Sequence, residues 1–359
     1  MTTSHPATGR APLSVLDLAP VRAGGTVAEA LQETLQLART VEDLGYHRFW
    51  LAEHHNIPGI ASAATSVLIG QVAAQTQRIR VGSGGVMLPN HAPMVIAEQF
   101  GTLAALFPGR IDLGLGRAPG ADMATAYALR RSQDNGQSFP TDLQELRAFL
   151  APAQPGQRIT AVPGAGSSIP LFLLGSSTFS AQLAAQEGLG FAFAAHFAPQ
   201  MMLDAFELYR SGFRPSPEFP EPYAMVGAYV TVAETDAEAR RLFTSTQQKH
   251  TWLMRGNARP TAPPVDDIDT FWSPMERASI DSQLREAVVG SPETVRAGLE
   301  SLLERTGAHE VIVATDAYDF DARLRSYELL GEAWGIDRLQ PDAAGAGAGA
   351  GARAAAPAG

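Results

Sequence analysis

The sequence predicts a closed (β/α)8 barrel with insertions after the fourth and seventh strands. Short apolar runs alternate with helical patterns eight times along the chain, which is typical of a parallel sheet with helical crossovers. Most runs are apolar throughout, as expected for strands buried on both faces. An open doubly wound sheet is the alternative, but the count reaches eight with no switch in pattern.

The strand–helix–strand unit is clearest in residues 78–122, where two apolar runs flank a helical pattern that ends before Pro108-Gly109. Thr26 is expected to cap the first helix and Gly45 to end it. The predicted strands are 13–18, 48–52, 79–83, 111–115, 170–174, 190–194, 223–232 and 310–315. The predicted helices are 27–44, 62–76, 93–107, 178–187, 199–209, 236–254, a helix that Ser291 caps, and 321–334.

Two long segments interrupt the alternation. Residues 118–169 contain helical pieces at 122–131 and 141–150 with a polar break between them, and residues 255–290 look irregular. Such excursions inside a regular pattern are typical of functional loops or lids. Residues 1–10 and the Ala/Gly tail 341–359 lack the means to pack and are expected to be disordered. The barrel is thus predicted to span residues 11–340.

Composition narrows the class of protein. The formal net charge of -10 argues against nucleic-acid and anionic-membrane partners. The chain contains no cysteine, which removes disulfides, thiolate nucleophiles and Cys-based metal sites. No apolar run reaches membrane-spanning length, and the first ten residues lack the apolar core of a signal peptide. A cytoplasmic location is expected.

The active site of such a barrel lies at the carboxyl ends of its strands. The residues found there are polar or small: Asp17, Glu53, His54, His55, Asn56, Ser83, Gly84, Gly85, Gly116, Arg117, Gly175, Ser176, Ser177, His196 and Asp316. These strand ends offer few paired carboxylates, and glycoside hydrolysis needs two acids that face each other, so the set argues against that activity. Neighbouring side chains on extended backbone point in opposite directions, so His54 and His55 are not expected to share a metal ion.

Two strand ends predict an anion site. Arg117 offers a permanently charged fork, and the turn Gly175-Ser176-Ser177 opens a helix with free N–H groups and hydroxyls. Together they would hold one phosphate. A surface ion pair for Arg117 and ordinary N-capping for the turn are the alternatives. The glycines at 114, 116 and 120 do not match the dinucleotide fingerprint in spacing, and a tight turn explains them better.

Two further strand ends suggest chemistry. His54 and His55 follow an apolar strand, where a histidine suits proton transfer; a structural histidine bonded to backbone is the alternative. The pair Gly84-Gly85 would allow a flat ring to lie on bare backbone, unless it only marks a β-bulge.

Three blocks resemble the bacterial luciferase-like flavin-dependent monooxygenases: WLAEHHN, VGSGGVMLPNHAPMVIAEQFGTLAALFPGRIDLGLGR and LLGSSTFSAQLAAQEGLGFAFA. The resemblance covers most of residues 12–335 and is closer to the single-chain, non-luminescent branch. It implies a barrel that binds FMN, with His54 as the catalytic histidine and a cis peptide bond between Gly84 and Gly85. It further implies that Arg117, Gly175, Ser176 and Ser177 hold the phosphate and that Glu53 and Ser83 belong to the cofactor site.

The resemblance also implies an activity. Reduced FMN and O2 would form a flavin C4a-hydroperoxide that oxidises a small apolar organic substrate, with reduced flavin from a separate reductase and a homodimeric enzyme. Gly116 stands where luciferase has a cysteine, so light emission is not expected. The alternatives are a reductase that uses deazaflavin F420, a flavin-binding protein without turnover, and a barrel that binds a sugar phosphate.

Overall fold

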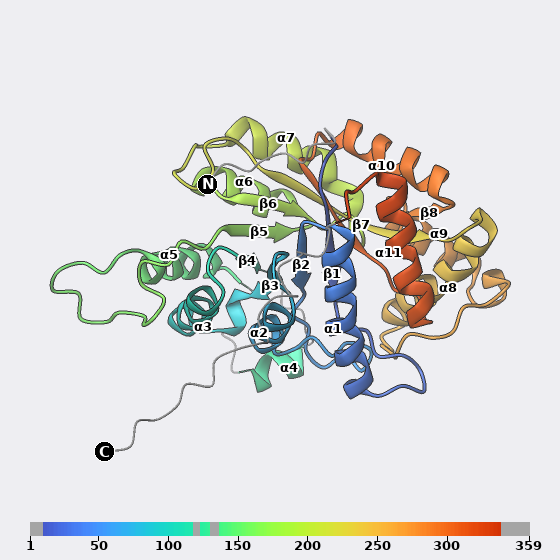
Figure 1. The fold of residues 1–359 in the computed structure, drawn as a ribbon, viewed down its shortest axis with the longest axis horizontal. Helices are drawn as coiled ribbons and strands as arrows, with labels where there is room; N and C mark the ends of the chain where they lie inside the picture. The colour runs from blue at the N-terminus through green and yellow to red at the C-terminus, as the bar shows by residue number, and fades with distance from the viewer. Residues whose placement is uncertain (1–9, 118–122, 130–135, 339–359) are drawn as a thin grey trace, which may run out of the picture.

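The computed structural model describes residues 10–117, 123–129 and 136–338, and within them eight parallel strands close into a barrel (Figure 1). Strand β6 pairs with β7, β7 with β9 and β9 with β1, which completes the ring. The predicted (β/α)8 class is therefore confirmed. The barrel strands are β1 (Leu13–Asp17), β2 (Arg48–Leu51), β3 (Arg80–Met87), β4 (Ile111–Gly116), β5 (Leu171–Gly175), β6 (Gly190–Phe193), β7 (Ala224–Val232) and β9 (Glu310–Ala314).

Helices surround the strands, as Figure 1 shows. Thr26 caps the first one through a capping box and Gly45 ends it in the left-handed conformation, as predicted. The helices are α1 (Val27–Leu44), α2 (Thr65–Gln75), α3 (Pro93–Leu106), α4 (Met123–Ala128), α5 (Phe139–Leu150), α6 (Thr178–Glu187), α7 (Met202–Gly212), α8 (Asp236–Met254), α9 (Pro274–Gln283), α10 (Pro292–Thr306) and α11 (Phe320–Trp334), with 3-10 turns η1 (Leu88–Asn90), η2 (Pro199–Met201) and η3 (Ile268–Thr270).

Both insertions differ in part from the prediction. The segment 255–290 is not irregular throughout, because it contains α9 and a short strand, β8 (Val288–Gly290), which pairs with the end of β7 outside the barrel. Helix α5 begins at Phe139 rather than 141, because Pro140 is well tolerated in a first helical turn. The residues predicted to be disordered at the two chain ends lie outside the described ranges, with the exception of Arg10. The guanidinium of Arg10 donates to the Trp334 carbonyl at 2.8 Å.

Two apolar layers hold the barrel together. The larger lies between the strands and the outer helices and includes Phe49, Val81 and Leu113. A second layer fills the barrel interior, where Trp50 and Phe172 meet edge to face at 5.0 Å. This interior packing leaves the carboxyl-terminal mouth open.

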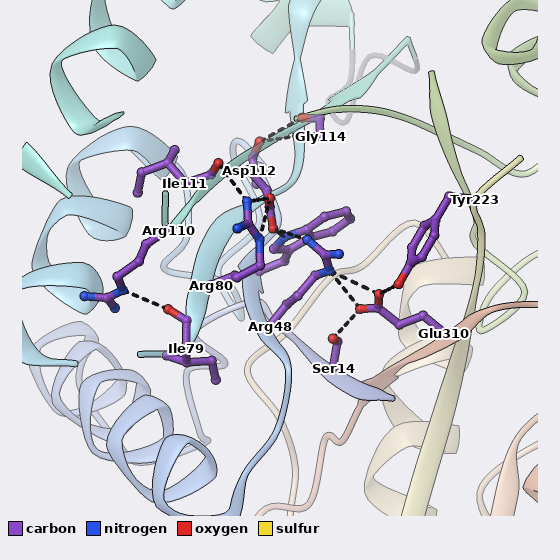
Figure 2. Close-up of polar contacts among 12 residues, drawn as sticks. Ser14, Arg48, Ile79, Arg80, Arg110, Ile111, Asp112, Gly114, Tyr223 and Glu310 are labelled. Carbon is purple, nitrogen blue, oxygen red and sulfur yellow. Dashed lines mark hydrogen bonds and ion pairs between the residues drawn. The ribbon is translucent and has the colours of Figure 1, made fainter. Parts of the chain in front are cut away.

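A charged network lies inside the barrel at the amino ends of the strands (Figure 2). Arg48 donates to Asp112 at 2.7 Å and to Glu310 at 3.0 Å, and Arg80 pairs with the same aspartate. Burial by itself raises the pKa of Asp112, but Arg48 and Arg80 outweigh it and hold that pKa below its usual value. Buried charges are tolerated when paired in this way. Trp50 also donates to Asp112 at 3.1 Å, so the network supports the floor of the mouth.

Candidate functional site

A cavity of about 930 Å³ opens at the carboxyl ends of the strands. Its volume falls in the range of small-molecule and cofactor sites. Seven of the nine predicted site residues line it, coming from four different strand ends: His54, Gly84, Gly85, Arg117, Gly175, Ser176 and Ser177. The other two, Glu53 and Ser83, lie behind the wall.

Arg117 lies against the start of α6. Its guanidinium stacks over the Phe179 ring at 4.1 Å, and Arg117 forms no ion pair among the described residues. The surface ion pair weighed as its alternative role is therefore not seen there. A permanent cation at the positive end of a helix is unfavourable unless an anion joins them.

The turn that opens α6 is not an ordinary cap. Ser177 occupies the N-cap position but makes no side-chain capping bond. By contrast, Thr235 and Ser291 cap their helices through their hydroxyls. Ser176 and Ser177, at the start of α6, line the cavity together with Arg117, and a helix start with serines beside a cation is the arrangement that phosphate binding needs.

The glycine pair forms bare backbone on β3, the strand next to the one that Arg117 follows. The Gly84–Gly85 peptide bond is cis, as the resemblance implies, and the pairing of β3 with β4 shifts register between Ser83 and Val86. The two readings of this pair are therefore compatible, because the bulge is present and both glycines line the cavity. A side chain on Gly84 would meet Leu16 at 2.5 Å, and one on Gly85 would meet the Gly114 carbonyl at 2.7 Å.

His54 and His55 have different surroundings, as their adjacency predicts. His54 lines the cavity, whereas Nε2 of His55 lies 2.8 Å from Glu53. Glu53 also accepts from the N–H of Met87 at 3.0 Å and approaches His91 at 2.9 Å. Burial raises the pKa of Glu53, but the hydrogen bonds from His91, His55 and Met87 hold it below its ordinary value. Glu53 therefore fixes the loop beside His54 from behind.

Ser83 has a comparable supporting position. Its hydroxyl donates to the Gly114 carbonyl at 2.8 Å and accepts from the Gly114 N–H at 3.0 Å. These bonds join β3 to β4 where the register shifts, so Ser83 holds the glycine wall in place.

A polar wall from β6, β7 and α8 was mostly missed by the sequence reasoning. His196, at the end of β6, lies against Gly227, and its buried Nδ1 has no hydrogen-bond partner among the described residues. Burial, with a smaller contribution from His250, lowers the pKa of His196 to about 3. Burial and Lys249 lower the pKa of His250 to about 4. Both rings are thus neutral at physiological pH.

The rest of this wall is hydrogen bonded. His250 approaches Gln283 at 3.1 Å and the Tyr229 hydroxyl at 3.3 Å. Lys249 pairs with Asp316 at 2.9 Å, both side chains being nearly buried. Asp316 was singled out from the sequence as a strand end. Lys249 and His250 come from α8 instead, so strand ends alone could not identify them as residues that line the mouth.

Neither a metal cluster nor a membrane-spanning helix is found in the described residues. Within residues 10–117, 123–129 and 136–338, no group of three or more His, Asp or Glu is arranged to hold a metal ion. Over the same ranges no helix has both the length and the apolar content to cross a bilayer.

The fold and this mouth define a barrel enzyme whose cavity combines an anion cradle, bare glycine backbone and a histidine. Comparison with known proteins gives its family. The family model for luciferase-like monooxygenases matches residues 12–310. A luciferase-like monooxygenase of Escherichia coli K12 is 53% identical over 88% of this chain and 95% of its own length. The chain belongs to the luciferase-like monooxygenase family.

Two further relatives agree with this assignment. The N-acetyl-S-alkylcysteine monooxygenase of Bacillus subtilis is 33% identical over 89% of this chain and 97% of its own length. The crystal structure of apo-MsnO8 superimposes with a TM-score of 0.82 at 39% identity, covering 92% of this chain and 100% of the other. The family supports a monooxygenase, and hence an oxidoreductase, as the class of enzyme.

Proposed function

We propose that this protein is a monooxygenase that uses reduced FMN and O2 to oxidise a small, largely apolar organic substrate. The observation that carries the proposal is the contact of Arg117 with the first turn of α6, where a cation, free N–H groups and unused hydroxyls meet at one cavity. That cradle fits a phosphate monoester such as the one FMN carries.

The remaining residues of the cavity fit the flavin as well. Arg117, Ser176 and Ser177 would hold the phosphate, and the wall of Gly84 and Gly85 would accept a flat ring, because a side chain at either position would meet its neighbours. When bound, reduced flavin supplies the two electrons that activate O2. The route of oxygen activation predicted above stays a prediction.

The chain's own groups would do three things. The phosphate cradle fixes the orientation of the cofactor, so that its reactive edge is presented to the substrate. His54, at the cavity wall, would hold or move a proton beside the reacting atoms. The apolar side chains of Leu16, Leu18 and Leu174, which also line the cavity, would exclude water from them.

The proposal is tested by titrating FMN into Arg117→Ala and Ser177→Ala. Loss of one charge-assisted contact is worth about 1.5–3 kcal/mol, so Arg117→Ala is expected to weaken FMN binding about 10- to 150-fold. Ser177→Ala is expected to have a smaller effect and to leave stability unchanged, because Ser177 caps nothing. Unchanged FMN affinity in Arg117→Ala would contradict the proposal.

The source of electrons and the choice of cofactor need separate measurements. We propose that a separate reductase supplies reduced FMN, so the purified chain should consume O2 with chemically reduced FMN and a substrate panel but not with NADH and oxidised FMN alone. A parallel titration with F420 separates FMN from that cofactor. Tight FMN binding with no substrate-dependent O2 uptake across wide panels would instead indicate a flavin carrier.

A further inference from the structure

A second cation faces the cavity at its rim. Arg259, in the segment after α8, lines the same cavity as Arg117, and its guanidinium stacks on the Trp252 ring at 3.9 Å. Arg259 forms no ion pair or hydrogen bond with a described residue. Its neighbour Arg255 approaches the same ring at 5.0 Å but pairs with Glu276 at 2.7 Å and does not line the cavity. Only one of these two arginines therefore offers the cavity a charge.

The backbone that carries Arg259 is held in place. The backbone N–H of Thr261 donates to the Val21 carbonyl at 2.9 Å, and the Thr261 carbonyl accepts from the Ala23 N–H at 2.8 Å. These two bonds tie the segment to the loop after β1. Gly59, whose carbonyl accepts from the Val21 N–H at 3.0 Å, lies so close that a side chain there would meet the Arg259 carbonyl at 2.5 Å. With its backbone packed against these two loops and its guanidinium on a tryptophan, Arg259 is ordered in advance, which reduces the entropy lost on binding.

The charge of the cavity is not balanced from within. Among the described residues, no aspartate or glutamate lines the cavity. Three basic side chains line it: Arg117, Lys249 and Arg259. Lys249 is neutralised from behind by Asp316 at 2.9 Å. Two guanidinium groups without a carboxylate partner among the described residues remain, in a protein whose formal net charge is -10, so the cavity selects for anionic groups.

Exposed apolar side chains also line the cavity that Arg259 faces. Phe197, Leu253 and Met254 line the cavity and keep 41%, 41% and 43% of their surface exposed. Exposed apolar side chains beside a ligand cavity are typical of the surface that receives an apolar group. The rim thus combines exposed apolar side chains with one ordered cation that has no ionic partner in the described part of the chain.

We propose that Arg259 binds the carboxylate of the substrate, and that the substrates are organic acids with an apolar body. This inference rests on the proposed function, since it assigns the first anion cradle to the cofactor. Arg259 then decides specificity: its planar fork matches a carboxylate, while the apolar body lies inward against the mouth.

Calorimetry with matched acids and amides tests this. The probes are 4-phenylbutanoate against 4-phenylbutanamide and octanoate against octanamide, titrated into the full chain with and without FMN. We expect the wild type to prefer each acid about five- to tenfold, and Arg259→Gln to lose that preference through weaker binding of the acid alone. Arg259→Lys should keep part of it. The matched control, Arg255→Gln, removes a cation from the same tryptophan and should keep all of it.

The outcomes separate this inference from the proposed function. Equal affinity of the wild type for acid and amide, or no measurable binding of either acid, overturns the role of Arg259. Weaker FMN binding in Arg259→Gln also overturns it, because the arginine would then serve the cofactor. Failure of the wild type to bind FMN contradicts the proposed function instead, and the acid preference is still measured in the titration without FMN.

Discussion

The charged floor of the barrel predicts a large and specific loss of stability on Asp112→Asn. Asp112 is fully buried and accepts from Arg48, Arg80 and Trp50. The change removes one negative charge and leaves two arginines facing a single carboxylate, Glu310. Breaking a buried pair costs about 3–5 kcal/mol. Because the Arg80 side chain is 22% exposed and also donates to the Gly109 carbonyl, we expect the lower end, about 3 kcal/mol.

Urea unfolding at pH 7.5 measures this loss as a lower midpoint with an unchanged m-value. The double variant Asp112→Asn with Arg80→Met restores charge balance and should recover at least about 1 kcal/mol of the loss. Asparagine keeps an oxygen for the Trp50 N–H, so FMN affinity should change far less than in Arg117→Ala. A loss below about 1 kcal/mol, or no recovery in the double variant, would refute the electrostatic account of the floor.

Two further predictions concern pH and assembly. The folded pKa values of His196 and His250 lie below the unfolded value of ~6.5. As pH falls below that value, protons bind the unfolded state in preference, so the contribution of these histidines to the free energy of unfolding is lost. At pH 5 each histidine should lower the free energy of unfolding by about 2 kcal/mol relative to pH 7.5. His250→Gln should therefore flatten the pH profile of stability measured by urea unfolding, and an unflattened profile would contradict this. Helix α2 has no charged residue, α3 has only Glu98, and Val67, Val95 and Leu106 are exposed there, a composition typical of interfaces. We propose a homodimer through this face; light scattering should give twice the monomer mass, and Val67→Glu with Leu106→Glu should give monomers, whereas a dimeric double variant would exclude this face.

The fold was predictable because its signals are local. Continuous apolar strands and well-placed caps such as Thr26 determine the alternation, and its eight repeats with no switch in pattern favour a barrel over an open sheet. Helix α9 was missed because Ile280 is its only buried residue, so it has little apolar period. Its Ser273-Pro274 start with Glu276 three residues after the cap forms a capping box, and that pattern could have revealed it.

The site was predictable only where it consists of strand ends. Arg117 and Ser176 could be brought together from the sequence because parallel barrel strands all end at one rim. Lys249 and Arg259 reach that rim from a helix and a connecting segment, whose path depends on tertiary contacts such as that between Gly59 and Arg259. Likewise, nothing local indicates that Arg48 and Glu310, 262 residues apart, form an ion pair.

The two ends of the barrel treat charge in opposite ways, and this difference separates stability from function. At the floor, Arg48 and Arg80 are paired with carboxylates inside the protein, so removing a partner destabilises the fold. At the mouth, Arg117 lies unpaired against a helix start among the described residues, so the folded protein gains little from its charge. Arg117→Ala should therefore leave the urea midpoint unchanged or raise it slightly, while FMN affinity falls. We therefore expect the charge of Arg117 to serve a bound anion rather than the stability of the fold.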